Sequence, residues 1–277
     1  MPLVRLLRSL PSFRPGIAYV LGDVLYLAPT TRSPVRKTLR SCRGPGFAAI
    51  DTTVIIPAAR TSPPICTVEE ESGLAPLPLD APEPTAEELG RLVEEFYAAR
   101  TATTATSTST ISLGSMGEQD GGVVFQGDGD PLLAIEVVLD TVRYVAARRN
   151  GIAFRLNTFG LVPSDSDNKE EEDVITKLVT SGVVACGDTD QRRETRIATV
   201  SVFVPAATPR HYDEILQPKN EKTNAFAQVC ACIAQLADAG VHVECTTVDR
   251  PGIQTGAIEA LTRALGATSF RTRSCIP

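Results

Sequence analysis

The stretch Val123-Val124-Phe125-Gln126-Gly127-Asp128-Gly129-Asp130-Pro131-Leu132-Leu133 contains the structural unit from which the chain is built. A short apolar run, typical of a buried strand, ends in a turn with two glycines, and this turn opens directly into a predicted helix, 131–149. Asp130 suits the N-cap of that helix, and Pro131 suits its first turn. A strand that leads through a polar turn into a helix is the repeating unit of a parallel α/β sheet.

The same unit recurs on both sides of this stretch. Upstream, an apolar hairpin is predicted at 17–20 and 24–28, and Thr85 with Glu88 forms a capping box at the start of a helix, 85–99. Downstream, strands are predicted at 152–157, 197–204, 241–248 and 268–273, and helices at 171–180, 223–239 and 254–265. About six such units are too few for a closed eight-stranded barrel, so we expect an α/β fold, either an open doubly wound sheet or a partial (β/α)6 TIM-like barrel.

Composition narrows the class of protein. The chain has 277 residues, of which 43% are apolar, and this is enough for a sizeable core. Its net charge is −6 and its pI is about 5.1, so a broad basic surface is not expected and nucleic acid is not an expected partner. No apolar run approaches the roughly 20 residues that span a bilayer, so a membrane is not an expected partner either.

Seven cysteines at scattered spacings and only two histidines argue against a disulfide framework and against a zinc-finger array. This usage fits a reducing compartment, so we expect a cytoplasmic protein. Residues 1–15 form an N-terminal extension with three arginines, no acidic residue and leucines at helical spacing. The alternatives for this extension are a frayed end and a weak mitochondrial presequence, which would make the protein mitochondrial.

The rest of the chain, 16–277, is predicted to form one domain with two insertions. The stretches at about 52–83 and 101–121 are rich in proline, small or acidic residues and lack the periodicity of helices and strands. Because such segments bury little apolar surface, we expect both to be disordered insertions at the surface.

Polar residues and glycines lie at the ends of neighbouring predicted strands. The candidate ligand-binding residues in these positions are Gly127, Asp128, Gly129, Asp130, Asn157, Thr158 and Ser201. The carboxyl ends of parallel strands meet at one edge of a sheet, where ligands bind. Glycines let a ligand approach the backbone, and a helix N-terminus favours an anionic group. The alternative is an ordinary set of strand–helix turns, in which glycine and asparagine serve the turn geometry.

A second group of candidates lies in the strand predicted at 241–248. His242 and Glu244 share one face of this strand because side chains alternate with a period of two. Together with Asp249 they are candidate acid/base groups for catalysis. The alternative is that this face is a solvated edge.

Four segments resemble motifs of the radical S-adenosylmethionine (SAM) superfamily. Gly127-Asp-Gly-Asp-Pro-Leu-Leu133 resembles its glycine-rich motif G-x-G-E-P-L-L, and Arg155-Leu-Asn-Thr-Phe-Gly-Leu161 resembles its second-strand motif R-[IL]-N-T-N-G. The third motif combines Val200-Ser-Val-Phe-Val-Pro205, Tyr212 and Leu216-Gln-Pro218, and it resembles the family segment S-[IV]-S-L-N-A…Y…P. The fourth, Val248-Asp-Arg-Pro-Gly-Ile253, resembles the C-terminal end of the family's domain. Their order is most similar to that of the small radical SAM proteins linked to TatD-type nucleases.

This resemblance implies a partial (β/α)6 TIM-like barrel of the radical SAM type, with a SAM pocket at the strand-end residues given above. In that family three cysteines spaced C-x-x-x-C-x-x-C hold a [4Fe–4S] cluster whose open iron binds SAM. The corresponding positions here are Ser33, Lys37 and Arg40, none of which is a thiol, and Cys42 is the one cysteine nearby. We therefore expect the cluster positions to be vacated and the [4Fe–4S] cluster to be absent, while SAM stays a candidate ligand.

Three hypotheses for function follow. The first is a radical-SAM-like pseudoenzyme that binds SAM or another small ligand as an accessory protein, where the positive charges of Lys37 and Arg40 would favour an anionic ligand. The second is an active radical SAM enzyme with an atypical iron–sulfur cluster on Cys42, Cys66 and Cys275. The third is a cluster-independent α/β enzyme that uses the acid/base candidates of the strand at 241–248. None of the three specifies a substrate or a protein partner.

Overall fold

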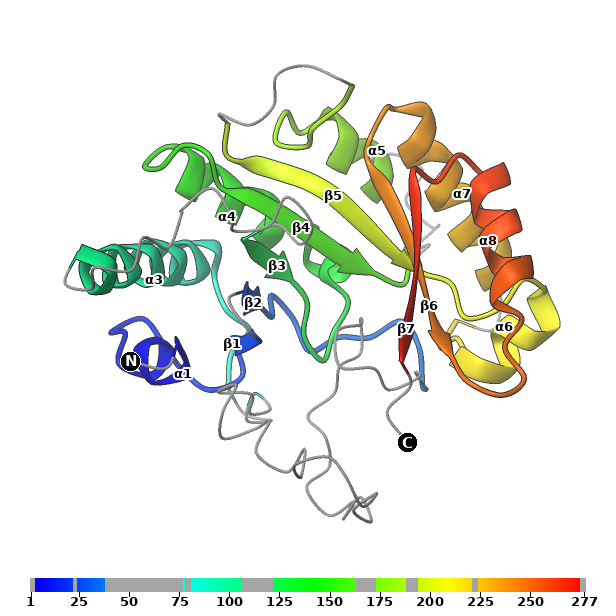
Figure 1. Ribbon diagram of the computed structural model, residues 1–277, viewed down its shortest axis with the longest axis horizontal. Coiled ribbons are helices and arrows are strands. Elements are labelled where there is room, and N and C mark those ends of the chain that lie inside the picture. Colours follow the sequence, from blue (N-terminus) through cyan, green and yellow to red (C-terminus); the bar gives the residue numbers. More distant parts are fainter. Residues whose placement is uncertain are drawn as a thin grey trace, which may run out of the picture.

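A sheet of seven strands lies at the centre of the protein, and its strands stand in the order of the chain, from β1 to β7 (Figure 1). The computed structural model describes residues 3–21, 24–37, 77, 81–105, 122–162, 173–187, 194–220 and 224–274. The strands are β1 Ala18–Leu21, β2 Val24–Leu27, β3 Val123–Phe125, β4 Ala153–Thr158, β5 Arg196–Phe203, β6 Val243–Asp249 and β7 Ser269–Ser274. The helices are α1 Leu3–Arg8, α3 Ala86–Ala105, α4 Ile135–Ala146, α5 Val174–Thr180, α6 Pro209–Leu216, α7 Ala225–Asp238 and α8 Thr255–Ala264, and a 3-10 turn, η3, covers Pro131–Ala134.

All strand pairs except the first are parallel. The predicted hairpin is confirmed, because β1 and β2 pair antiparallel with Ala18 opposite Leu27. The later pairs, from β2–β3 to β6–β7, are parallel. At least one helix lies in the chain between each two successive parallel strands. The predicted α/β class is therefore confirmed.

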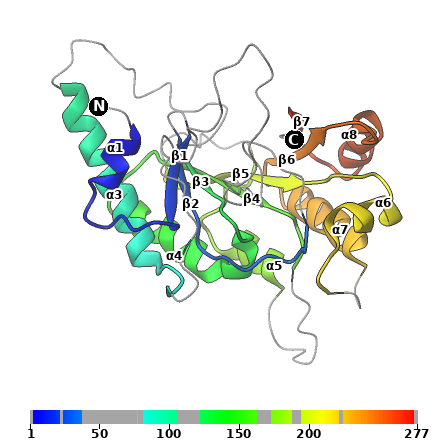
Figure 2. The ribbon, with the colours of Figure 1, turned by 90° about the horizontal axis from the view of Figure 1, so that it is seen from below.

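The sheet is open and singly wound. In a doubly wound sheet the strand order reverses once and helices cover both faces, whereas the order here never reverses. Successive helices contact one another, α3 with α4, α4 with α5 and α5 with α7, and Figure 2 shows α4, α5 and α7 on one side of the sheet. Over the described ranges β1 and β7 are the two edges, so the sheet does not close into a barrel.

Local sequence signals account for the helix boundaries. At the start of α3 the Glu88 N–H donates to Thr85 Oγ1 at 3.2 Å, and the Thr85 N–H donates to Glu88 Oε2 at 3.3 Å, which completes the predicted capping box. The apolar residues of this helix that face the core are all fully buried; they are Leu89, Leu92, Val93 and Phe96. The helix predicted at 131–149 begins as the 3-10 turn η3 and ends at Ala146.

The N-terminal segment packs into the same hydrophobic core. Leu6, Leu7 and Leu10 are 8%, 0% and 8% exposed, and α1 contacts β1 and α3. Residues 3–10 are therefore part of the packed structure, although the sequence alone assigns them to an extension.

The two predicted insertions lie mainly outside the described residues. Of the first, at about 52–83, the structure describes residue 77 and residues 81–83, and Leu77 is buried. Of the second, at 101–121, it describes residues 101–105, which continue helix α3. A search of the described residues for a helix that is long and apolar enough to cross a membrane finds none.

Candidate functional site

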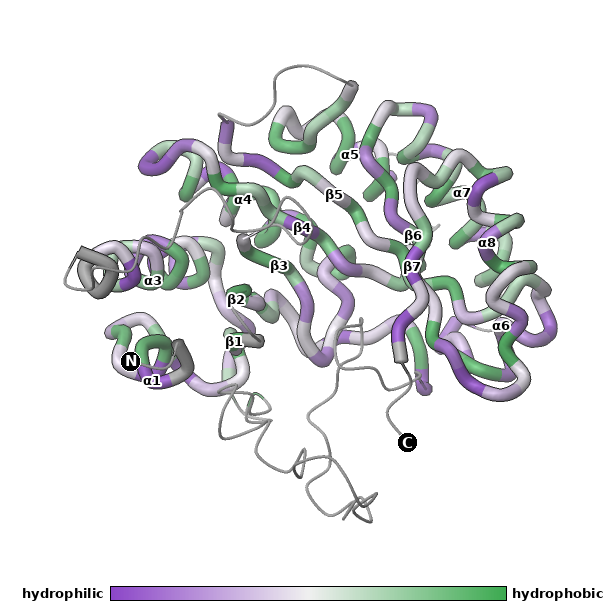
Figure 3. Tube along the Cα trace, in the orientation of Figure 1, coloured by the Kyte–Doolittle hydropathy of each residue, from purple (hydrophilic) through white to green (hydrophobic). Residues whose placement is uncertain are grey.

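The two faces of the sheet differ in chemistry. In β4 the buried side chains of Phe154 and Leu156 belong to the main hydrophobic core, while Arg155 and Asn157 alternate with them and therefore lie on the opposite face. We call this opposite face the polar face; its residues are Gln126, Arg155, Asn157, Ser201, Glu244, Thr246, Arg271 and Arg273. Figure 3 contrasts the hydrophobic β3 with β7, whose residues are largely hydrophilic.

A chain of hydrogen bonds crosses the polar face from β1 to β6. Gln126 Nε2 donates to the Tyr19 hydroxyl at 3.2 Å, and Gln126 Oε1 accepts from Asn157 Nδ2. Asn157 Oδ1 in turn accepts from Arg155 Nε at 2.9 Å, and Arg155 donates to the carboxylate of Glu244. These polar groups are buried, and their mutual hydrogen bonds reduce the cost of that burial.

Glu244 is the acceptor of two ion pairs at the end of this chain. Its Oε1 accepts from Arg155 and, at 2.9 Å, from Arg271 Nη2. The side chains of Arg155 and Glu244 are 4% and 12% exposed, so this pair is almost fully removed from water. Glu244 therefore balances arginine charge, and its carboxylate is not available as a base for a substrate.

Arg273 is the third arginine of the polar face. It is 8% exposed, and its Nε is buried without a hydrogen-bond partner. Burial lowers the pKa of its guanidinium to about 10, and the neighbouring charges of Arg271 and Arg155 act in the same direction. The positive charge at Arg273 is thus held in an unfavourable environment in the folded chain.

Two hydroxyl groups of the polar face lack hydrogen-bond partners. Ser201 is 1% exposed and Thr246 is 0% exposed, and neither hydroxyl has a partner within the described part of the chain. In the sheet Ser201 stands between Asn157 of β4 and Glu244 of β6. Buried hydroxyls without partners are uncommon in native proteins, so these two groups mark the centre of the polar face as a place where further polar contacts can be made.

Asp130, one of the predicted ligand-binding residues, is instead fully engaged with the protein itself. Its carboxylate accepts from the Leu132 N–H at 2.9 Å, from the Phe159 N–H at 2.8 Å and from the Thr158 hydroxyl at 2.7 Å. It therefore caps η3 and ties this turn to the end of β4. Burial raises its pKa to about 6, although these hydrogen bonds act in the opposite direction.

The two glycines of the turn provide space for the chain rather than for a ligand. A Cβ on Gly127 would collide with the side chain of Ala28, and a Cβ on Gly129 would lie 2.6 Å from the Arg32 carbonyl oxygen. The Asp130 N–H also donates to the Arg32 carbonyl at 2.8 Å. Asp128 is the partly exposed residue of this turn.

The segment that follows β2 is a strap across the ends of the strands, and we define this strap as residues 28–37. After passing the glycine turn it reaches the end of α6, where the Lys37 N–H donates to the Leu216 carbonyl at 3.0 Å. Val35 forms a bridge with Pro218, and the Ser33 hydroxyl bonds to the backbone of Val35. Of the predicted vacated cluster positions, Ser33 is thus used within the strap and the Lys37 side chain is exposed, whereas Arg40 and Cys42 lie outside the described residues.

The described cysteines do not offer a cluster site. Cys232 and Cys245 are buried, and burial raises the pKa of the Cys245 thiol to about 12 and that of Cys232 further. Among the residues that the structure describes, no group of three or more histidines, cysteines, aspartates or glutamates is placed to hold a metal. Ser33 and Lys37 lack the thiolates that a [4Fe–4S] cluster needs, so the residues present at these positions do not fit this group.

The predicted acid/base group is not assembled. His242 is exposed, and its Nδ1 lies 3.3 Å from Thr199 Oγ1. Glu244 is buried between arginines. Asp249 is exposed at the end of β6 and lies on the opposite face of this strand from Glu244. Tyr212, from the third family motif, is buried in the core against Phe226, with ring centroids 5.8 Å apart.

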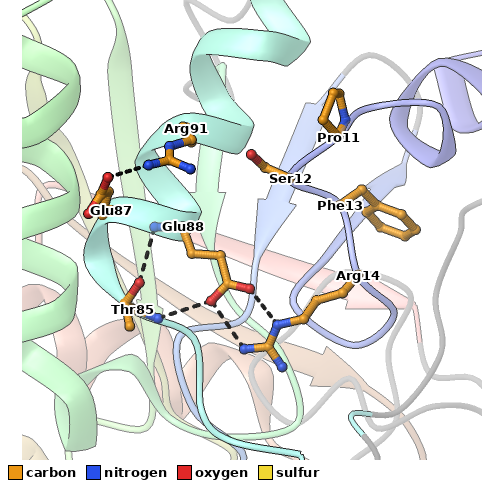
Figure 4. A pocket seen from close by; sticks show the side chains of 8 residues that line it. All are labelled: Pro11, Ser12, Phe13, Arg14, Thr85, Glu87, Glu88 and Arg91. Atoms are coloured by element: carbon orange, nitrogen blue, oxygen red, sulfur yellow. Dashed lines mark hydrogen bonds and ion pairs between the residues drawn. The ribbon is translucent and has the colours of Figure 1, made fainter.

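A pocket of about 430 Å³ lies away from the polar face, between the loop after α1 and the start of α3 (Figure 4). Its charged side chains are satisfied by one another, because Arg14 pairs with Glu88 at 2.5 Å and Arg91 pairs with Glu87. This pocket therefore offers no unpaired charge to a ligand.

Sequence reasoning missed the arginines of the polar face. Arg271 and Arg273 follow Ser269 at intervals of two residues along β7, so all three lie on one face of the strand. This spacing can be read from the sequence. The sequence does not show, however, that the two arginines lie near Glu244 of β6 and Arg155 of β4.

No protein-family model matches this chain, and no curated protein matches it. The likeness to radical SAM proteins consequently rests on the motifs quoted from the sequence.

Proposed function

We propose that this chain is a radical-SAM-like protein that lacks the [4Fe–4S] cluster and binds a small polar ligand on the polar face of its sheet. The observation that carries the proposal is the set of buried polar groups around Arg155 and Glu244, which includes hydroxyls without partners. Burying polar groups costs free energy, and natural proteins depart from an apolar interior mainly at functional sites. The protein would then be a pseudoenzyme or an accessory subunit that holds its ligand without radical chemistry.

The strand arrangement supports a partial (β/α)6 TIM-like barrel as the scaffold. Burial raises the pKa of Tyr19 on β1, and the charge of Arg273 on β7 acts in the opposite direction, although these strands are the opposite edges of the sheet. In a flat sheet six strand spacings would separate them by roughly 29 Å, and a charge has little effect over that distance. Strong curvature toward the polar face, as in a half-barrel, accounts for this proximity.

The strap supports the loss of the cluster. A bound cluster supplies the electron for radical chemistry on SAM, and it requires three thiolates in the loop after the first parallel strand. In this chain that loop begins with the strap, whose Ser33 and Lys37 bind α6 and the backbone of the strap itself. These hydrogen bonds give the strap a structural role at the positions where the family has cluster ligands.

SAM is the ligand that the resemblance implies, and Asp130 limits how it could be held. The carboxylate of Asp130 accepts from two N–H groups and one hydroxyl, which occupies most of its acceptor capacity. The ammonium group of SAM would therefore need another acceptor. This favours the broader version of the proposal, a small polar ligand, over SAM in the geometry that the family motif implies.

Calorimetric titration of the full chain with SAM tests the proposal, with the Ser201→Val variant as the comparison. Binding that Ser201→Val abolishes would support the polar face as the site and SAM as its ligand, because valine replaces the hydroxyl by two methyl groups, which remove the hydrogen bond and fill the space beside it. Heat that is unchanged in the variant would place the ligand elsewhere and contradict the proposal. If SAM gives no heat, SAM is excluded, and the polar face must bind a different small ligand for the proposal to hold.

A further inference from the structure

The charges of the polar face do not balance. Its residues include three arginines, Arg155, Arg271 and Arg273, and one carboxylate, that of Glu244. Glu244 pairs with Arg155 and Arg271, whereas the Nε of Arg273 is buried without a hydrogen-bond partner in the described part of the chain, and Glu244 offsets the charge of Arg273 only from a distance. Three positive charges against one negative charge leave an excess of two, and Arg273 is the buried arginine to which a negative group from outside the face could bind.

A buried guanidinium without a counter-ion is costly in a folded protein. Arg273 retains only 8% of its exposure, and the charges of Arg271 and Arg155 oppose its own. Natural proteins retain unfavourably buried charges mainly at functional sites, where a bound ligand pairs with the charge and stabilises the folded protein. The burial of Arg273 is thus explained if a negative charge binds beside it.

Two hydroxyls on the same face of the sheet as this arginine are of the kind that accompany anion binding. Ser201 and Thr246 are buried, and their hydroxyls are without partners in the described structure. Each can donate one hydrogen bond to an anionic oxygen, while the planar guanidinium of Arg273 can donate two in parallel. A cation would be repelled by the three arginines, so the chemistry selects an anion.

We infer that the polar face binds an oxyanion, a phosphate or carboxylate group of the ligand, through Arg273 with the hydroxyls of Ser201 and Thr246. This inference rests on the proposed use of the polar face for a small ligand and names the chemical class of that ligand. Neither the strap nor the turn at Asp130 takes part. The site is therefore a different one from the anion site that the sequence suggests beside Lys37 and Arg40.

The first test uses inorganic phosphate and succinate as probes for the two kinds of oxyanion. The full chain is titrated with each at constant ionic strength, balanced with potassium chloride, and the midpoint of thermal unfolding is recorded. We expect phosphate, succinate or both to raise the midpoint, and the probe with the larger effect identifies the kind of oxyanion. Loss of one charge-assisted hydrogen-bond donor in Arg273→Gln should weaken this binding about tenfold or more.

A matched control removes the same charge elsewhere. Arg210 is a surface arginine of α6 whose side chain is 92% exposed, so Arg210→Gln should leave the response to both probes unchanged. Ser201→Ala and Thr246→Val are milder changes, each of which should weaken binding by a few-fold. An equal response in Arg273→Gln and Arg210→Gln would overturn the inference, and so would no response of the wild type to either probe.

A second readout separates a ligand-binding arginine from a structural one. Without probes, Arg273→Gln should unfold at a higher temperature than the wild type, because it removes an unpaired buried charge. A structural role for Arg273 predicts a lower unfolding midpoint and would overturn the inference. If SAM binds in a way that Ser201→Val abolishes while phosphate and succinate both fail, the oxyanion assignment is wrong and the proposed function stands.

Discussion

At the scale of single residues, Asp130 shows how one side chain can connect two elements. It caps η3 through the Leu132 N–H and holds the end of β4 through Thr158 and Phe159. The sequence identifies Asp130 correctly as an N-cap. It does not reveal the second connection, because that depends on the neighbouring strand.

Replacing Asp130 by Asn should destabilise the protein. An amide has one acceptor oxygen, so its NH2 group would face the Phe159 N–H or the Thr158 hydroxyl, and the free energy of unfolding should fall by about 1–3 kcal/mol. Urea unfolding at pH 4 measures this loss. A variant as stable as the wild type would show that the second connection contributes nothing.

The same pair of proteins gives a pH dependence with a defined sign. Burial raises the pKa of Asp130 from 3.8 to about 6, so its contribution to stability is complete below about pH 4 and is lost as the pH rises through about 6. The stability gap between wild type and Asp130→Asn should therefore shrink by roughly 3 kcal/mol at most between pH 4 and pH 7. A gap that widens with pH would mean that the hydrogen bonds outweigh burial.

Glu244 is the second residue whose role the structure defines. Glu244→Gln removes the negative charge between Arg155 and Arg271, and leaving the buried Arg155 uncompensated should lower the free energy of unfolding by about 3 kcal/mol or more. The matched control is Glu214→Gln on the surface of α6, where the change should stay within about 0.5 kcal/mol. Urea unfolding of both variants checks this; similar small losses in the two would contradict a balancing role for Glu244.

At the scale of elements, the strap depends on close contact with the glycine turn. Gly129 lies against the backbone of Thr30 and Arg32, so a methyl group there has no room. Gly129→Ala should lower the free energy of unfolding by about 1–3 kcal/mol, because backbone rather than a flexible side chain must move. Chemical unfolding measures the change.

The control for this prediction is a glycine with open space around it. Gly256 lies in α8, and a Cβ there would meet no atom within 4 Å. Gly256→Ala should stabilise the protein by about 0.5–1 kcal/mol, since alanine loses less backbone entropy in a helix. If the two alanine variants behaved alike, the packing of the strap on the turn would not be the cause.

Elements with local signals could be predicted from the sequence, and contacts between distant elements could not. The capping box at Thr85 and the N-cap at Asp130 lie within a few residues of the helices they start, so the sequence locates these helices. The strap has no periodicity, and its partners in α6 are far along the chain. On the polar face the sequence identifies Asn157, Ser201 and Glu244 as candidates, but it does not identify the arginines that define the charge of this face.

At the scale of the whole molecule, strand order is the most informative feature. Seven strands in chain order with contacting helices on one side make a singly wound sheet, whereas the sequence predicts either a doubly wound sheet or a partial (β/α)6 TIM-like barrel. The N-terminal helix completes the same core through Leu7. From β4 to β7 the second face of this sheet carries polar residues, and that part of the face is where we place the ligand.

The proposed function requires that the protein works without a [4Fe–4S] cluster. Anaerobic reconstitution of the full chain with iron and sulfide, followed by an iron count and an electron paramagnetic resonance spectrum after reduction, tests this most directly. We predict colourless protein with no stoichiometric iron and no cluster signal, because Ser33 and Lys37 cannot act as thiolate ligands. A reducible [4Fe–4S] cluster in stoichiometric amount, held by cysteines such as Cys42, Cys66 and Cys275, would contradict the account.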